Sequence, residues 1–203
     1  MTKTVEYIFD FAGPNGYLAW YPLKEIVERT GATLVVTPVL LGGMHKLTGN
    51  SPPMMRDADV KGKVAYASLE FNRFLDRHGM TRFTIPKAFP FNSILLQRVL
   101  VAAADEEERQ ALIDALLPAV WERGLDCGDV DAVAAELAAA GFDAQRLLEA
   151  TQDPEVKQRL IDNTEGAVER GTFGIPTYFV GEEMWFGKER LAQLEEYLGG
   201  GKP

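Results

Sequence analysis

A short turn near the amino terminus contains the first residues whose types and spacing could do chemistry. The run Gly13-Pro14-Asn15-Gly16 follows strand-forming residues and precedes residues with helical spacing. At such a junction the free N–H groups of the first helical turn point at whatever lies in front of the helix, which favours an anion such as a thiolate or a carboxylate. The same run also suits a plain turn without function, because glycine, proline and asparagine all favour turns.

A second segment, Gly174-Ile175-Pro176-Thr177, stands directly before a predicted strand near the carboxyl terminus. A proline at the start of a strand often only marks its edge, and most peptide bonds before proline are trans. Thioredoxin-like chains instead have a cis proline at this position, facing the turn before their first helix. By that resemblance we expect Pro176 to be cis and Ile175 to offer its backbone N–H and C=O to an extended peptide, as an added strand would.

The composition argues against several classes of function. The chain has 21 lysine and arginine residues against 30 aspartate and glutamate residues, so its net charge is −9 with both histidines neutral. Because such an acidic chain repels phosphate backbones, we expect no nucleic-acid partner. The single cysteine, Cys127, excludes an internal disulfide, a CxxC redox pair and a cysteine-based zinc site, and two histidines are too few for a histidine-rich metal centre. No metal is expected.

The amino-terminal residues lack the basic region, apolar core and cleavage site of a signal peptide. No apolar run approaches the roughly 18 residues that suggest a membrane span. We therefore expect a cytoplasmic protein without a membrane partner, in keeping with its low cysteine content.

Several single residues favour a structural interpretation over a chemical one. We interpret His45 as a polar loop contact and His78 as a favourable charge at a helix end. Cys127 is interpreted as an ordinary small residue. Met54 and Met55 stand in a proline-rich loop, which is either a flexible lid or merely exposed. Some aromatic residues are either core residues or part of an aromatic substrate pocket: Tyr66, Phe71, Phe74 and Trp121.

Three elements at the start of the chain must position the first turn. Residues 5–11 alternate between apolar and polar types and predict a strand. From Tyr17, apolar residues recur at helical spacing until Gly31 ends the pattern. Residues 32–41 are β-branched and aliphatic and predict a buried strand, so the chain opens with a β-α-β unit.

The middle of the chain, from about Gly42 to Arg170, contains no run that predicts a strand. Helices are predicted over 60–78 and 131–140, from Asp105, and after the N-cap residues Asp143 and Asp153. Strand-forming residues return at 177–180 and 183–186, which predict a hairpin, and a helix over 188–198 follows.

This order of elements predicts the fold class. A βαβ unit, a helical segment and a ββα unit are typical of an α/β thioredoxin-like domain that is interrupted by an all-α insertion domain. The predicted thioredoxin-like domain comprises residues 1–41 plus 171–203, and the helical insertion domain comprises residues 42–170.

Two stretches of this sequence, together with the helical insert, resemble one known family. The pattern FDF-x-x-P-x-x-YLA begins at Phe9, and FGIPTYFVGEEMWFGKERL begins at Phe173. Both resemble 2-hydroxychromene-2-carboxylate isomerase, a family related to kappa-class glutathione transferases and to the disulfide-forming DsbA proteins. The resemblance spans nearly the whole chain. It implies that glutathione binds to the thioredoxin domain, that the helical domain covers the substrate, and that the protein is a homodimer.

Carried over residue by residue, the resemblance implies a glutathione site. Ile175, the residue before Pro176, pairs with the cysteinyl backbone of glutathione. Lys188 and Glu189, near the start of the last helix, hold the γ-glutamyl end, and Glu189 stands where the family usually has aspartate.

The resemblance also implies a substrate site formed by the insert. Lys63, Tyr66 and Glu70 are spaced at i, i+3 and i+7, and so lie on one helix face. Lys63 and Asn92 would hold the carboxylate or other oxygens of an aromatic carboxylate substrate. Asn50 matches a further polar position that we associate with substrate contact, together with Tyr66.

One departure from the family pattern concerns the first turn. The family has Ser-Pro-x-Ser there, and its first serine hydrogen-bonds the glutathione sulfur, whereas Gly13 has no side chain. A hydrogen bond to a charged group contributes roughly 1.5–3 kcal/mol, so its loss would cost about one to two decades of rate. The helix-start N–H groups, with the amide of Asn15, remain to lower the pKa of a thiol. Gly13, Asn15, Lys63 and Asn92 are therefore the catalytic candidates.

We expect a glutathione-dependent isomerase of 2-hydroxychromene-2-carboxylate-like intermediates of aromatic degradation, with the glutathione thiolate as a transient nucleophile. Two alternatives stay open. One is a glutathione transferase that acts on another aromatic electrophile. The other is a non-catalytic binder of glutathione or a peptide that has lost the active-site serine at position 13.

Overall fold

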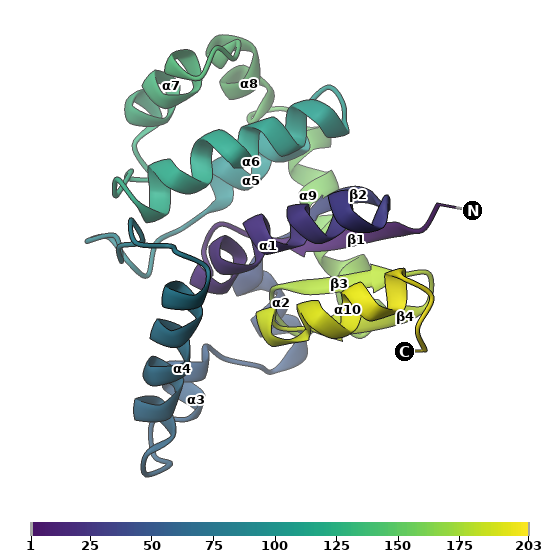
Figure 1. Cartoon of the computed structure of the whole chain (residues 1–203). Coiled ribbons are helices and arrows are strands. Elements are labelled where there is room, and N and C mark those ends of the chain that lie inside the picture. The colour runs from purple at the N-terminus through teal and green to yellow at the C-terminus, as the bar shows by residue number, and fades with distance from the viewer. Residues whose placement is uncertain (1, 203) are drawn as a thin grey trace.

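A four-stranded mixed sheet forms the centre of the protein in a computed structural model that describes residues 2–202. The strands lie in the order β2-β1-β3-β4 (Figure 1). β1 and β2 are parallel, while β3 is antiparallel to both β1 and β4, so the predicted β-α-β unit and the predicted hairpin are both present. The strand bounds are β1 Thr4–Phe9, β2 Thr33–Pro38, β3 Thr177–Val180 and β4 Glu183–Phe186.

The two faces of β1 belong to different hydrophobic cores, because successive side chains of a strand point to opposite faces. Tyr7 and Phe9 lie in the larger core with Trp20 of α1 (Pro14–Thr30). Ile8 lies in a smaller core with Met44, on the face where the helices α2 and α9 pack together. α10 (Leu191–Leu198), which follows a 3-10 turn η1 (Lys188–Arg190), packs against α1.

Within the described residues, the chain between β2 and β3 contains helices and no strand, as the sequence predicts. Asp143 and Asp153 each accept a hydrogen bond from a backbone N–H in the following turn, which confirms the two predicted N-caps. Asp105 caps α6 in the same way. No helix of the described residues has the length and apolar character that crossing a membrane requires. The bounds are α2 Leu41–Thr48, α3 Pro53–Arg56, α4 Lys63–Arg77, α5 Ile94–Val101, α6 Glu106–Trp121, α7 Val130–Ala139, α8 Ala144–Ala150 and α9 Pro154–Glu169.

The helices α3 and α4 form an arm that projects away from the sheet (Figure 1). No residue of α4 is buried, although Phe71 and Phe74 in its carboxyl-terminal half pack against the larger core. Met54, Met55 and Tyr66 are exposed on this arm. The arm is therefore attached to the body of the protein mainly through the second half of α4.

Several element boundaries differ from the sequence prediction. The first helix begins at Pro14 rather than at Tyr17, because proline suits the first position of a helix. The second strand ends at Pro38, and Leu41 already begins α2. His45 therefore lies in the last turn of α2 and not in a loop, which corrects its interpretation.

Candidate active site

The turn before α1 and the segment before β3 meet in space. A Cβ atom added to Gly13 would lie 2.9 Å from Cδ1 of Ile175 and 3.6 Å from Cδ2 of Leu41. The peptide bond between Ile175 and Pro176 is cis, as the sequence analysis expects. Residues 13, 41 and 175 therefore surround one point, which we call the junction.

Backbone groups at the junction are free to bind a ligand. Within residues 2–202, the N–H of Asn15 and both the N–H and the C=O of Ile175 form no hydrogen bond. The first turn of α1 carries no acidic side chain that would neutralise the positive end of the helix dipole. The junction can therefore hold an anion and pair with an extended peptide.

Buried aromatic side chains hold the turn before α1 in place. Nε1 of Trp121 donates a hydrogen bond to the carbonyl of Phe11 over 3.1 Å. The hydroxyl of Tyr7 donates to the carbonyl of Gly16, also over 3.1 Å. Because both aromatic residues are fully buried, the N–H groups at the start of α1 are already oriented before a ligand arrives, which lowers the ordering cost of binding.

A buried carboxylate lies next to the junction, and it was not among the predicted site residues. Asp10 is 1% exposed, and it accepts hydrogen bonds from the N–H of Leu41 over 2.7 Å and of Ala12 over 2.9 Å. Burial raises the pKa of Asp10 to about 6, although its hydrogen bonds act in the opposite direction. The signal in the sequence is an acidic residue between Phe9 and Phe11 at the end of a buried strand.

Lys188 and Glu189 lie beside the junction, because the N–H of Gly187 donates to the carbonyl of Pro176 over 2.9 Å. The ammonium group of Lys188 donates to Glu70 of α4 over 2.7 Å and also to Glu189. The side chain of Lys188 is only 2% exposed, whereas that of Glu189 is 48% exposed. A ligand would therefore meet the carboxylate of Glu189 and not the ammonium group of Lys188.

Lys63 and Tyr66 lie farther out on the arm. Nζ of Lys63 donates to Asp57 over 2.9 Å, and Tyr66 is 62% exposed. Lys63 precedes Glu70 by two helical turns, which is about 10 Å along the axis of α4. Within the described chain, neither residue forms a hydrogen bond or an ion pair with the junction. The structure thus brings Glu70 to the predicted glutathione site, and leaves Lys63 and Tyr66 on the exposed part of the arm.

Two of the three asparagines predicted for the site, Asn50 and Asn92, are engaged in backbone contacts. Nδ2 of Asn50 donates to the carbonyl of Phe173 over 2.8 Å, so Asn50 supports the segment that leads to the cis proline. Oδ1 of Asn92 accepts from the N–H of Ile94 over 2.9 Å, close to the start of α5. Asn50 therefore joins two distant segments, and Asn92 stabilises the turn before α5.

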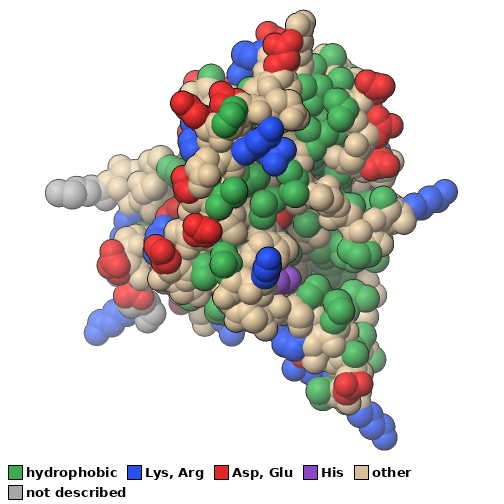
Figure 2. All heavy atoms as spheres, turned by 180° about the vertical axis from the view of Figure 1, so that it is seen from behind, with side chains coloured by type: hydrophobic (Ala, Val, Ile, Leu, Met, Phe, Trp, Pro, Cys, Tyr) green, Lys and Arg blue, Asp and Glu red, His purple; other side chains and the backbone are tan. Residues whose placement is uncertain are grey.

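An aromatic cluster stands next to the turn before α1. The rings of Phe83, Phe89 and Phe91 lie 5.6, 5.8 and 5.6 Å from the ring of Trp121. Trp121 itself contacts the turn through its hydrogen bond to Phe11. Figure 2 shows a hollow flanked by hydrophobic side chains between the arm and the body of the protein. These features are suitable for an apolar, aromatic ligand.

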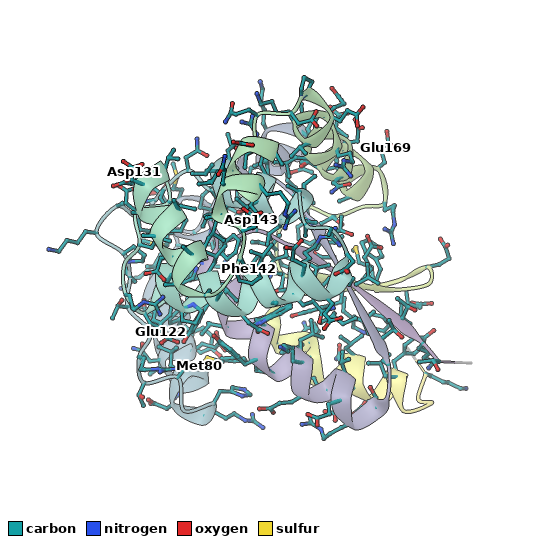
Figure 3. The ribbon with its side chains drawn as sticks, turned by 90° about the horizontal axis from the view of Figure 1, so that it is seen from above. Met80, Glu122, Asp131, Phe142, Asp143 and Glu169 are labelled. Carbon is teal, nitrogen blue, oxygen red and sulfur yellow. The ribbon has the colours of Figure 1, made fainter. Side chains whose placement is uncertain are left out.

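A separate cavity of about 180 Å³ contains none of the predicted site residues. Met80 and Glu122, which lie near each other in Figure 3, both line it. Glu122 accepts a hydrogen bond from the hydroxyl of Tyr17 over 2.9 Å and pairs with Arg82 over 3.0 Å. Because these polar groups already satisfy one another, the cavity is not a second candidate site.

The remaining thiol and imidazole groups are not suited to catalysis at the junction. Burial raises the pKa of the Cys127 thiol to about 12, so the group stays protonated. His78 ends α4, where its ring packs 4.3 Å from that of Phe74. Burial and the charge of Arg77 lower the pKa of His78, which disfavours the charged ring that the sequence analysis expects.

Comparisons with known proteins agree with the fold. A family model described as a DSBA-like thioredoxin domain matches residues 4–199. The 2-hydroxychromene-2-carboxylate isomerase of Pseudomonas putida is 30% identical and covers 96% of this chain and 94% of its own. Glutathione S-transferase kappa 1 of Homo sapiens is 29% identical, with coverage of 98% and 92%.

A solved structure of a selenomethionine-labelled 2-hydroxychromene-2-carboxylate isomerase is similar throughout. It matches with a TM-score of 0.84 and 28% identity, and the match covers 97% of this chain and 94% of that one. The expected thioredoxin-like α/β fold with a helical insertion is thereby confirmed.

Proposed function

The chain belongs to the DSBA-like thioredoxin domain family, and from this membership we propose that it is a glutathione-dependent isomerase of aromatic intermediates resembling 2-hydroxychromene-2-carboxylate. The observation that carries the proposal is the junction, where free backbone groups of α1 and of the segment before β3 meet. The similarity of the whole chain to isomerases and to a kappa-class transferase supports an enzymatic role.

The junction suits a tripeptide thiol. An extended cysteinyl residue would exchange two hydrogen bonds with the free N–H and C=O of Ile175, as an added strand does. Its side chain would then point toward the N–H of Asn15 at the positive end of α1. That position lowers the pKa of a thiol and favours the thiolate, without a hydroxyl group from residue 13.

The charged cluster beside Pro176 would hold the γ-glutamyl end of glutathione. Lys188 is shared between two carboxylates, Glu70 and Glu189, so its charge is compensated and the half-exposed carboxylate of Glu189 faces the ligand. It is therefore suited to the α-ammonium group of the ligand. Lys188 would act indirectly, because its buried ammonium group orients the carboxylate of Glu189.

The substrate would lie against the aromatic cluster and under the arm. Bound glutathione would supply a thiolate that adds to a conjugated carbon of the substrate, permits bond rotation, and then leaves. The amide nitrogen of Asn92 would hold a substrate oxygen, since its own oxygen is occupied by Ile94. Lys63 would contribute a positive charge after release from Asp57, and Tyr66 would contact the substrate as the arm closes. Asn50 would position the loop before Ile175.

The direct test mixes the protein with glutathione and 2-hydroxychromene-2-carboxylate and follows ultraviolet absorbance. We expect conversion to the open-chain isomer at micromolar enzyme only when glutathione is present. Glutathione binding is measured separately by tryptophan fluorescence, because Trp121 contacts the turn that carries the site. Binding without any glutathione-dependent conversion overturns the isomerase assignment.

A glutathione transferase is the second candidate, and the similarity to human kappa 1 favours it. A transferase leaves the sulfur of glutathione covalently attached to its product, whereas an isomerase regenerates free glutathione. Mass spectrometry of the products from a panel of aromatic electrophiles distinguishes the two reactions.

A non-catalytic glutathione binder is the third candidate, because Gly13 stands where the resemblance implies a serine. Such a protein would bind glutathione and show no turnover with either substrate class. A large gain of turnover in Gly13→Ser would identify a decayed enzyme, whereas little change would support a mechanism that uses backbone groups.

The proposed setting is the cytoplasm, where the glutathione pool is reduced. Cys127, the single cysteine, is a buried free thiol and is compatible with such a compartment. Cell fractionation with an antibody against the protein tests this proposal.

A further inference from the structure

One buried carboxylate serves the amino-terminal ends of two helices at the junction. Oδ1 of Asp10 accepts from the N–H of Ala12, just before α1, and Oδ2 accepts from the N–H of Leu41, the first residue of α2. The N-cap residues of these helices, Gly13 and Leu40, provide no capping side chain of their own. Asp10, the residue directly after β1, thus acts as a shared cap and links the two helix ends that surround the candidate anion site.

The charge of Asp10 is not neutralised by a nearby cation. The groups that donate to its carboxylate are uncharged, namely backbone N–H groups and the hydroxyl of Ser93. Cys127, between α6 and α7, lies close enough for the charge of Asp10 to raise the pKa of its thiol, and other titratable residues on nearby helices include His45 on α2 and Arg98 on α5. Within the described residues none of these three forms an ion pair with Asp10.

The same region contains a buried amide that is only half satisfied. Nε2 of Gln97 donates to the carbonyl of Phe9, the last residue of β1, and to that of Val39, which directly follows β2, each over 2.7 Å. Oε1 of Gln97 is buried and has no hydrogen-bond partner within the described residues. A buried amide oxygen without a hydrogen-bond partner indicates that water does not reach this region. Asp10 therefore lies in a poorly solvated environment, where ionisation of its carboxyl group costs free energy.

We propose that Asp10 is a positioning residue of the active site, which holds the helix ends around the junction and controls through its own charge how strongly the junction binds the anionic sulfur of glutathione. This inference rests on the proposed glutathione site. Asp10 is fully buried and does not touch the ligand, so it acts through the backbone groups that it shares with α1 and α2.

The physical basis is a competition between two anions for the same helix ends. An ionised Asp10 uses the positive ends of α1 and α2, and it also repels a second negative charge in front of Gly13. When Asp10 takes up a proton, both effects weaken, so an anion binds more tightly. By linkage, a bound anion must raise the pKa of Asp10 above its value of about 6 in the free protein.

The test compares two glutathione analogues whose sulfur groups do not titrate between pH 5 and 8. Glutathione sulfonate places a permanent negative charge at the sulfur position, and S-methylglutathione places none there. We expect calorimetric titration to show that the sulfonate binds about five-fold or more tightly at pH 5 than at pH 8, with S-methylglutathione much less affected. Equal pH dependence of the two ligands overturns the proposal.

Variants assign the effect to Asp10. Asp10→Asn keeps one acceptor oxygen and removes the charge, so the difference between the two ligands should no longer change with pH. Ser93→Ala removes a donor that favours the ionised carboxylate, so the pH dependence should move to higher pH. His45→Gln, which removes a titratable side chain in the last turn of α2, should leave the profile unchanged.

The outcomes separate this inference from the proposed function. If neither analogue binds the wild-type protein at any pH, the glutathione site itself is wrong, and the inference falls with it. If both bind but Ser93→Ala leaves the profile unmoved, the glutathione site stands and the role of Asp10 is rejected. The Ser93→Ala result remains decisive even if Asp10→Asn does not fold.

Discussion

Ile175 occupies the space that a side chain at position 13 would need. A Cβ atom on residue 13 would lie only 2.9 Å from Cδ1 and 3.3 Å from Cγ1 of Ile175. The glycine is therefore matched to an isoleucine across the junction, and the serine that the resemblance implies would not be accommodated without movement. Because Cδ1 is the free end of a flexible side chain, the required movement is local.

This contact predicts that Gly13→Ser and Ile175→Val are coupled. Gly13→Ser alone should destabilise the fold by about 1 kcal/mol through overpacking, although serine reduces the entropy of the unfolded chain. Ile175→Val removes Cδ1 and should make room, so the double variant should be more stable than the sum of the single effects. Urea unfolding of the four proteins measures this coupling, and additive effects would show that the contact carries no strain.

A second prediction at the residue scale concerns the pH dependence of stability. The pKa of Asp10 is about 6 in the folded protein, above its ordinary value of 3.8, so the folded state holds this proton more tightly than the unfolded state. The contribution of Asp10 is thus most favourable below pH 3.8 and becomes less favourable as the pH rises through 6. The full change corresponds to about 3 kcal/mol.

Urea unfolding at pH 4.5 and 7.5 measures this contribution. The stability difference between the wild-type protein and Asp10→Asn should shift in favour of Asp10→Asn as the pH rises. Other carboxylates shift stability equally in both proteins, because their surroundings are unchanged. A difference that is constant with pH would show that Asp10 is ionised throughout this range.

At the scale of elements, a buried ion pair connects the arm to the thioredoxin-like part of the chain. Lys188, which begins η1, donates to Glu70 of α4, and its ammonium group also lies 5.0 Å from the ring centre of Phe74 on the same helix. These contacts hold the carboxyl-terminal half of α4 beside Pro176. The outer half of α4 has only the exposed ion pair between Lys63 and Asp57.

This arrangement predicts that Glu70→Gln loosens the arm. Lys188 is nearly inaccessible to solvent, so the loss of one of its two carboxylate partners should cost about 1–2 kcal/mol. Hydrogen exchange of peptides from residues 63–77 should become faster. The control is Lys63→Gln, which removes an exposed pair and should change stability by less than about 1 kcal/mol. Equal effects of the two variants would argue against an anchoring role for Lys188.

At the scale of the whole molecule, apolar side chains on and near the arm are exposed to solvent in a single copy of the chain. Leu47 lies in α2, near the arm, and Leu69 lies in α4 itself, and both are exposed. Met54, Met55 and Val60 are also exposed. The family resemblance implies a homodimer, and such a surface is suitable for a contact between two copies of the chain.

The prediction is that sedimentation measures twice the mass of one chain. Met55→Glu combined with Leu69→Glu should shift the protein toward the monomer, because two carboxylates would be desolvated in each half of the contact. Val130→Glu on α7 is the matched control, since Val130 is also an exposed hydrophobic residue but lies far along the helical segment from the arm. A monomeric wild-type protein, or equal dissociation by Val130→Glu, would reject the arm as the interface.

The features that depend on residues close together in the chain could be predicted from the sequence alone. Asp143 and Asp153 cap helices through hydrogen bonds to backbone groups two or three residues away. The hairpin of β3 and β4 has the predicted bounds, because its strands are joined by a tight turn. The order of elements, and with it the thioredoxin-like fold, follows from such local patterns, and the family resemblance located Pro176 opposite the first turn.

Only the tertiary structure decided how side chains distant in the sequence share their partners. Lys188 faces Glu70 across 118 positions, which turns a predicted ligand-binding cation into an internal one. Lys63, predicted on the same helix face as Glu70, lies two turns farther out and pairs with Asp57. Asp10 accepts a hydrogen bond from the N–H of Leu41, which joins it to the start of α2, and no local sequence pattern predicts that contact. The physical reason is that burial, charge compensation and steric fit depend on which segments meet, and these are properties of the packed chain.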